Sequence, residues 1–213
     1  MHTDTVTKAL NNISFTIDKG AFVSVIGPSG SGKSTLLSLI CGLDEPSEGK
    51  IIIDGSIITE MSEDEKAIYR RSHVGIIYQF FNLIPILTVS ENIGLPLYLD
   101  RKAFSKDNID EVLYKLGLQD KAMRFPDQLS GGEQQRAAIG RVILSRPPLI
   151  LADEPTGNLD SKNALEVMKL FQYMNQQLGL TIILVTHNED YAKMATRIIE
   201  LKDGEIVSDY ETV

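Results

Sequence analysis

Residues 27–35 read "GPSGSGKST", and this stretch decides how the rest of the chain is interpreted. The apolar run 21–26 precedes it and is rich in β-forming residues, while the apolar run 35–40 follows and suits the start of a buried helix. A strand, a glycine-rich loop and a helix are the context in which the pattern G-x-x-x-x-G-K-[ST] binds phosphate groups. The stretch therefore predicts a phosphate-binding loop.

The residue types in this loop each suit a phosphate. Glycine can adopt positive φ and lets the backbone approach a ligand closely, so the N–H groups at the new helix start can point at an anion. We expect Lys33 to place its charge near the β- and γ-phosphates and Ser34 to offer its hydroxyl to Mg²⁺. A plain turn with a surface lysine is the alternative, and it leaves the flanking strand and helix unexplained. The predicted binding residues are Gly27, Pro28, Ser29, Gly30, Ser31, Gly32, Lys33, Ser34 and Thr35.

Length and composition limit the class of protein. The chain has 213 residues and a net charge of −8, which suits one α/β domain over residues 1–213 and argues against nucleic acid as the main partner. A single cysteine, Cys41, excludes a disulfide framework and favours a reducing compartment. No apolar run is long enough to span a membrane, and the first residues lack the apolar centre of a signal peptide.

The order of elements predicts a largely parallel sheet with its ligand at the strand ends. Residues 80–145 read as a helical insertion, in which Pro85 and Pro96 interrupt the apolar segment 80–99. Strands are expected within 9–18, 48–56, 73–79, 147–155 and 180–188, with a hairpin at 197–209, and helices within 63–71, 106–117, 131–144 and 161–179.

Three of the predicted strands end in polar residues that suit phosphate chemistry. The apolar run 149–152 leads into Asp153, which could hold Mg²⁺ through water, and Glu154, which could polarise an attacking water. The alternative is a pair of solvated loop acids. Gln79 and His187 also follow strands. Such residues alone are more often structural, but at the same sheet edge Gln79 is a candidate for Mg²⁺ or the water, and His187 for the γ-phosphate.

A second glycine motif, "LSGGEQQR", occupies residues 129–136. Ser130, Gly131 and Gly132 offer a hydroxyl and free N–H groups at a helix start, so they suit an anion that is already held elsewhere, because no lysine is present. Ser130 and Glu133 can also form a capping box. Capping does not explain the two glycines, since glycine weakens the first turn of a helix.

Taken together, "GPSGSGKST", Gln79, "LSGGEQQR", "LILADEP", "GNLD" and His187 resemble, in this order, the ATP-binding subunits of ABC transporters. The resemblance covers almost the whole chain. It implies an α/β P-loop NTPase with a RecA-like core, an antiparallel β-subdomain and a helical subdomain at about 80–145. It also implies that two copies pair head to tail, with each ATP between the phosphate loop of one copy and the "LSGGE" loop of the other.

The resemblance also implies roles for individual residues. Those expected to act on the nucleotide of their own chain are Lys33, Ser34, Gln79, Asp153, Glu154 and His187, with Mg²⁺ held by Ser34, Gln79 and Asp153. Ser130, Gly131 and Gly132 are expected to act on the partner's nucleotide, and Asp160 of "GNLD" to lie at the dimer seam.

Two segments, 81–97 and 153–160, are similar to one branch of this family, the lipoprotein-release, macrolide-export and antimicrobial-peptide-resistance ATPases. That branch implies an integral membrane permease as partner, mechanical work as the output, and a cytoplasmic position at the inner face of the cell membrane. One feature departs from the family. An aromatic residue that stacks on adenine is expected near the start, but no aromatic residue precedes Phe15. Two explanations stay open, a shortened start or a more weakly held adenine.

Other functions fit the sequence less well. Soluble ABC-type ATPases of DNA repair carry long coiled-coil or zinc insertions, whereas the segment from Gln79 to Leu129 is short and has no cysteine. A nucleotide switch without hydrolysis would have no need of Glu154. A phosphoryl-transfer kinase would leave the "LSGGE" loop without a role.

Overall fold

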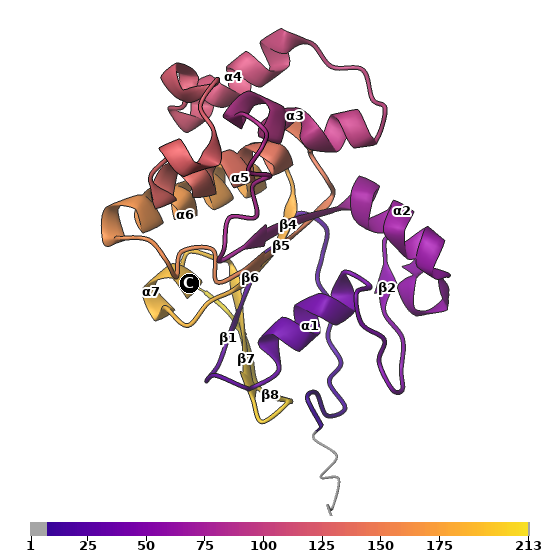
Figure 1. Cartoon of the computed structure of the whole chain (residues 1–213). Coiled ribbons are helices and arrows are strands. Elements are labelled where there is room, and N and C mark those ends of the chain that lie inside the picture. Colours follow the sequence, from indigo (N-terminus) through magenta and orange to yellow (C-terminus); the bar gives the residue numbers. More distant parts are fainter. Residues whose placement is uncertain (1–7, 213) are drawn as a thin grey trace, which may run out of the picture.

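A computed structural model describes residues 8–212 and contains one six-stranded sheet with helices on both faces (Figure 1). The strand order is β4-β5-β6-β1-β7-β8, and all neighbours are parallel except β7 and β8. The strands are β1 (Phe22–Ile26), β4 (Val74–Tyr78), β5 (Leu149–Asp153), β6 (Thr181–Val185), β7 (Arg197–Lys202) and β8 (Glu205–Glu211). The predicted α/β class and the predicted hairpin at 197–209 are confirmed.

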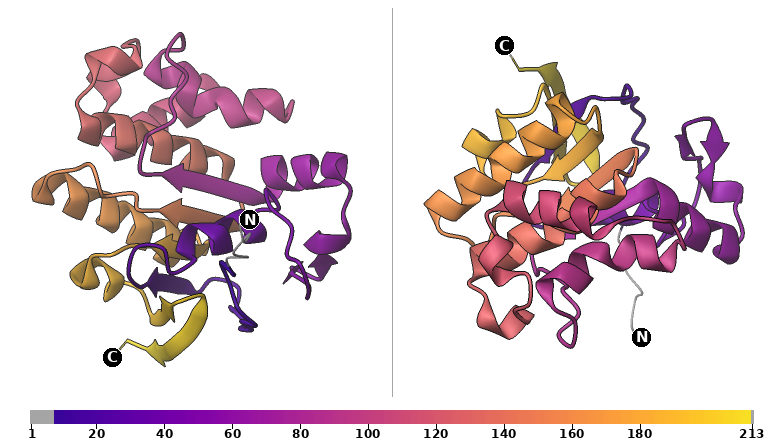
Figure 2. Two further views of the ribbon diagram at one scale, coloured as in Figure 1. Left: turned by 60° about the horizontal axis from the view of Figure 1, so that its bottom comes forward. Right: turned by 90° about the horizontal axis from the view of Figure 1, so that it is seen from above.

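The helices form two layers, one on each side of the sheet (Figures 1 and 2). One layer contains α1 (Lys33–Ile40) and α2 (Glu63–His73), with a small antiparallel pair, β2 (Ile52–Ile53) and β3 (Ser56–Ile57), beside them. The other contains α3 (Val89–Leu99), α4 (Lys106–Leu116), α5 (Gly131–Ser145) and α6 (Ser161–Gln176). The short helix α7 (Glu189–Ala192) follows β6, and short 3-10 turns occupy Ile58–Glu60, Gln119–Lys121 and Pro126–Gln128.

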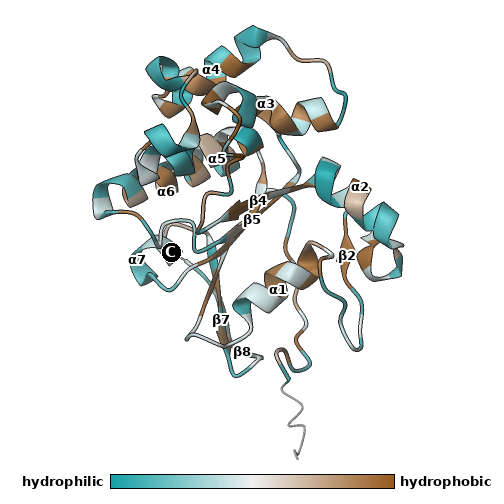
Figure 3. Ribbon diagram, viewed as in Figure 1, coloured by the Kyte–Doolittle hydropathy of each residue, from teal (hydrophilic) through white to brown (hydrophobic). Residues whose placement is uncertain are grey.

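The central strands β5 and β6 are apolar over most of their length because both faces are covered. In β5, Ile150 and Ala152 join the core beneath α3 to α6, while Leu149 and Leu151 join the core beneath α1 and α2. The same strands are among the most hydrophobic parts of the ribbon in Figure 3. Two-sided burial explains why these strands read as uninterrupted apolar runs, and it fixes the positions of the loops that follow them.

The predicted strand at 9–18 is wrong. The segment is irregular, although its side chains alternate between half-buried and exposed, and Ile13, Phe15 and Ile17 pack against the core of α1. Asn12 has a φ of 50°, which bends the backbone out of the extended region, and the segment forms no strand pairing within the described residues. The alternation came from one-sided burial alone.

The predicted interruption at Pro96 is also wrong, because Pro96 lies inside α3. A proline has no N–H, so the carbonyl of Asn92, four residues earlier, loses its helical donor. Here the side chain of Arg141 replaces that donor, with Nε 3.1 Å from the Asn92 oxygen. A side chain from α5 therefore makes the proline tolerable, which the local sequence does not reveal.

The helices α3 to α5 fall within the predicted insertion at 80–145 and lie together above the sheet in Figure 1. The division of residues 1–213 into one domain with a helical subdomain stays a prediction. Among residues 8–212, none of the helices has both the length and the apolar content needed to cross a bilayer.

Candidate nucleotide-binding site

Four parallel strands deliver the predicted site residues to one edge of the sheet. The phosphate loop follows β1, Gln79 follows β4, Asp153 ends β5 and is followed by Glu154, and His187 lies just after β6. These strands are contiguous in the order β4-β5-β6-β1 and run in the same direction. The fold therefore gathers residues from distant parts of the sequence, at the strand ends where sheets of this kind bind ligands.

The phosphate loop adopts a backbone that requires glycine. Gly27, Gly30 and Gly32 have φ values of 147°, 79° and 99°. A Cβ on Gly27 would lie 2.0 Å from the carbonyl oxygen of Leu201, and one on Gly32 would lie 2.4 Å from that of Ala9. Pro28, Ser29, Gly30 and Ser34 are exposed, Thr35 is half-buried and Ser31 is buried. The loop is a cradle that larger residues would distort.

The start of α1 is left open for a ligand. Its N-cap residue is Gly32, which makes no side-chain hydrogen bond to the first turn, and no acidic residue lies in that turn. The Lys33 ammonium donates to the carbonyl oxygens of Gly27 and Pro28, both at 2.8 Å. A cation inside a loop of glycines at an uncapped helix start fits the phosphate groups of a nucleotide.

Glu154 occupies a strained position at the end of β5. It has a φ of 47°, and its N–H donates to the carbonyl of Val185 at 3.0 Å. Its Oε2 lies 2.9 Å from His187 Nδ1, but the alignment is not that of a hydrogen bond. Within the described chain, this buried oxygen has no hydrogen-bond partner. A buried carboxylate oxygen with no hydrogen bond, next to a histidine at the same sheet edge as the phosphate loop, is well placed to orient a water.

Gln79 is held by the "GNLD" loop. Its Nε2 donates to Asn158 Oδ1 at 3.3 Å, and Asn158 Nδ2 donates back to the Gln79 carbonyl at 3.2 Å. The sequence prediction included the loop but gave no role to Asn158. The pairing joins residues that are far apart in the sequence, so no local pattern could have found it.

The second glycine motif starts α5 on the opposite layer from the phosphate loop. Ser130 caps the helix, and Glu133 Oε2 accepts from the Ser130 N–H at 2.8 Å and from its Oγ at 2.9 Å. The predicted capping box is therefore present. The side chains nearest to Gly131 and Gly132 belong to Phe81, Leu159 and Asn163. Within one chain, this motif borders the "GNLD" loop.

Asp160 and its neighbours fix the start of α6. The carboxylate of Asp160 accepts from the Asn163 N–H at 2.9 Å and from Asn163 Nδ2 at 2.7 Å. The backbone N–H of Asn163 is the main reason that the pKa of Asp160 is lowered. Arg136 of α5 donates to Asn163 Oδ1 at 3.2 Å, which links the two helices. Asp160 is therefore a capping residue of its own chain, with its carboxylate already engaged.

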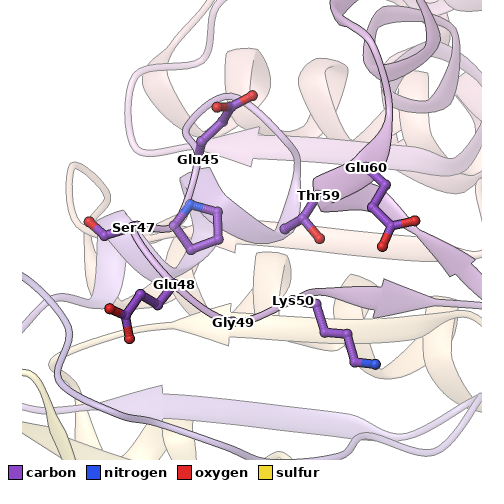
Figure 4. Close-up of a pocket in the computed structure, with 8 residues that line it drawn as sticks. Glu45, Ser47, Glu48, Gly49, Lys50, Thr59 and Glu60 are labelled. Carbon is purple, nitrogen blue, oxygen red and sulfur yellow. The ribbon is translucent and has the colours of Figure 1, made fainter.

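A separate hollow of about 480 Å³ lies away from these residues, between the segment Glu45–Lys50 and Thr59–Glu60. Figure 4 shows its lining, in which the carboxylates of Glu45, Glu48 and Glu60 outnumber the single amine of Lys50. A lining with this charge does not suit a nucleotide's phosphates. The hollow contains none of the predicted site residues.

Residues 10–157 match the ABC transporter family. The chain belongs to this family. It is 47% identical over 203 residues to the ABC transporter ATP-binding protein MJ1508 of Methanocaldococcus jannaschii, covering 94% of this chain and 90% of that protein. It is also 45% identical to the lipoprotein-releasing system ATP-binding protein LolD 1 of Chlorobium chlorochromatii, covering 93% and 82% of the two chains.

A solved structure supports the same assignment. The ATP-binding cassette MJ0796, in a dimeric post-hydrolysis state bound to ADP and Pi, superposes with a TM-score of 0.88 at 44% identity, covering 96% of this chain and 91% of that one. The chain is thus an ABC ATPase with the fold predicted from its motifs. The expected adenine-stacking aromatic concerns the start of the chain, where residues 1–7 lie outside the described part.

Proposed function

We propose that this ABC ATPase pairs with a second copy of itself on ATP binding and uses hydrolysis to drive an integral membrane permease. The observation that carries the proposal is the contact between Glu154 Oε2 and His187 Nδ1, 2.9 Å apart, at the sheet edge that also presents the phosphate loop. In this role Lys33 binds the β- and γ-phosphates, Glu154 orients the attacking water, and His187 contacts the γ-phosphate. The dimeric MJ0796 structures support pairing as the working state.

Mg²⁺ fits the same edge of the sheet. The available ligands are the exposed hydroxyl of Ser34, the carboxylate of Asp153 and the amide oxygen of Gln79. Magnesium prefers oxygen ligands and is usually held by one or two carboxylates together with substrate phosphates. The bound ion would neutralise phosphate charge.

Glu154→Gln tests the catalytic assignment. We expect ATP binding to survive and hydrolysis to slow by about 10²–10⁴-fold, because general-base assistance is lost while the amide keeps the shape of the side chain. A dimer should then accumulate with Mg-ATP, measurable by size-exclusion chromatography and phosphate release. Glu189→Gln, an exposed acid in α7, is the matched control. Hydrolysis by Glu154→Gln at the wild-type rate would show that Glu154 is not the water-orienting acid.

An apolar surface beside Gln79 supports a membrane partner. Phe80 is 71% exposed, Ile84 39% and Ile86 82%, and we call these three residues the docking patch. They lie one, five and seven residues after Gln79, so a change at the nucleotide can reach them through a short stretch of backbone. A short permease helix laid on such a patch would bury apolar area on both partners. The relative MacB of Bdellovibrio bacteriovorus, 46% identical over 97% of this chain, is an ATP-binding/permease protein of which this chain covers 32%. With such a partner, the subunit would sit at the inner face of the membrane.

Phe80→Asp tests the docking patch. We expect ATP hydrolysis by the purified subunit to stay within about twofold of wild type, since the side chain is exposed, while co-purification of an integral protein from membranes is lost. Tyr114→Asp, at a 73% exposed position on α4, provides a control of similar chemistry. Equal recovery of the same integral protein with Phe80→Asp and wild type would rule out the patch.

A further inference from the structure

Gln135 is a fully buried amide in α5 to which the sequence motif assigned no role. Its exposed fraction is 0%, and it lies one turn after the glycines of "LSGGEQQR". Figure 1 shows α5 lying over β4 and β5, the strands that lead to Gln79 and Glu154. The Gln135 side chain reaches from α5 toward the strand ends that carry Gln79 and Glu154.

The amide nitrogen of Gln135 joins the ends of both strands. Nε2 donates to the carbonyl oxygen of Pro155 at 2.7 Å and to that of Tyr78 at 3.2 Å. The Tyr78 carbonyl belongs to the peptide that leads into Gln79, and Pro155 directly follows Glu154. One NH₂ group has two hydrogens, so both donors are used on these two segments.

The amide oxygen of Gln135 is buried without a hydrogen-bond partner among the described residues. An unsatisfied buried acceptor is destabilising, and a methionine of similar length would remove it, although the carbonyl oxygens of Tyr78 and Pro155 would then lose their Gln135 donor. The two N–H groups of the amide, by contrast, both donate to backbone carbonyls, those of Tyr78 and Pro155. The geometry thus combines a structural disadvantage with a specific contact behind two proposed catalytic groups.

We propose that Gln135 is a positioning residue that holds Gln79 and Glu154 of its own chain in register. The inference rests on the proposed function, in which those two residues serve the nucleotide of their own chain and the Ser130–Gly132 loop serves the partner's nucleotide. Gln135 lies on the helix that this loop starts, but it supports Gln79 and Glu154 of its own chain and not the partner's nucleotide. A small displacement of groups around a reaction centre can lower the rate by about 10²-fold.

The first experiment compares Gln135→Met with wild type. We expect kcat to fall about 10- to 100-fold and the affinity for ATP to stay within about twofold, while the protein stays folded with a lowered melting temperature because two carbonyl oxygens lose a donor. Gln135→Leu is measured in parallel in case methionine disturbs packing, and Gln176→Met, at an exposed position on α6, is the control. A wild-type kcat for both Gln135 variants would overturn the inference.

The second experiment separates this role from a role in shaping the Ser130–Gly132 loop, which we call the signature loop. Mixed dimers are isolated with two tags, one chain carrying Glu154→Gln, so that only the other chain's site hydrolyses ATP. Gln135→Met is then placed in either chain, and single-turnover hydrolysis is measured. We expect a 10- to 100-fold loss when it lies in the hydrolysing chain and less than about twofold when it lies in the other. The same variant is present in both dimers, so a general folding defect would affect them equally.

The reverse result, in which the rate falls mainly when Gln135→Met lies in the chain with Glu154→Gln, would overturn the inference and assign the residue to the signature loop. Equal losses in both arrangements would overturn it as well. Failure of the proposed function has a separate sign. The mixed dimer without any Gln135 change would then fail to form with ATP or fail to hydrolyse it, and this arm is measured first.

Discussion

The two glycine-rich helix starts of this protein look alike in sequence and differ in structure. The phosphate loop ends at Gly32, which leaves the first turn of α1 without a side-chain cap or an acid, and Lys33 lies against it. The signature loop ends at Ser130, whose capping box with Glu133 satisfies the start of α5. The first start suits an anion by itself, whereas the second carries an acid and suits only an anion already fixed by another group. This asymmetry fits the proposed function, in which a nucleotide is shared between two chains.

Lys33→Ala should have the largest effect on ATP binding, because it removes the cation that distinguishes the phosphate loop from the signature loop. Truncating one member of a buried charge pair costs about 2–5 kcal/mol, so we expect ATP affinity to fall by at least about 30-fold and hydrolysis to be lost. Titration with a fluorescent ATP analogue measures the loss. Lys169→Ala, an exposed position on α6, is the control. ATP affinity within twofold of wild type would mean that the glycine backbone alone holds the phosphates.

The two signature glycines offer a finer test. A Cβ on Gly131 would lie 3.4 Å from Phe81 Cζ, an ordinary contact, whereas one on Gly132 would lie 2.2 Å from Asn163 Oδ1. We expect Gly131→Ala to keep the melting temperature and to lower hydrolysis about tenfold or more, because the new methyl group adds bulk to the helix start that the proposed function assigns to the partner's nucleotide. Gly132→Ala should lower stability by about 1–3 kcal/mol through overpacking.

Thermal melts and ATPase assays on both alanine variants separate these effects. ATP binding by the isolated subunit should be unchanged in Gly131→Ala, since its own phosphate loop is intact. Wild-type hydrolysis by Gly131→Ala would remove the proposed difference between the two loops, because the second would then make no close contact with a nucleotide.

The sequence predicted the position of the candidate site residues at the strand ends better than it predicted the surrounding structure. Gly27 to Thr35, Asp153 and Glu154 could be placed because each follows a strand whose two-sided burial leaves a clear apolar run. The tolerance of Pro96 could not be predicted, since it depends on Arg141 from another helix. Gln135 and Asn158 were missed as individual residues because their roles lie in contacts with distant carbonyl and amide groups, which no local periodicity encodes.

The smallest expected effect concerns the capping box that sets the second loop apart. The Ser130 N–H is the main reason that the pKa of Glu133 is lowered in the folded protein. A carboxylate with a lowered pKa stabilises the fold fully above its unfolded value of about 4.3, and this contribution is lost as the pH falls through the folded value. Glu133→Gln should therefore be less stable than wild type by about 0.5–1 kcal/mol at pH 7, with the difference in unfolding free energy shrinking in acid.

Urea denaturation at pH 7 and in acid measures this difference, with Asp110→Asn, an exposed acid on α4, as the control. A difference that stays constant with pH would mean that the capping box works through shape alone. The first turn of α1 has no acid, so the phosphate loop should show no such dependence.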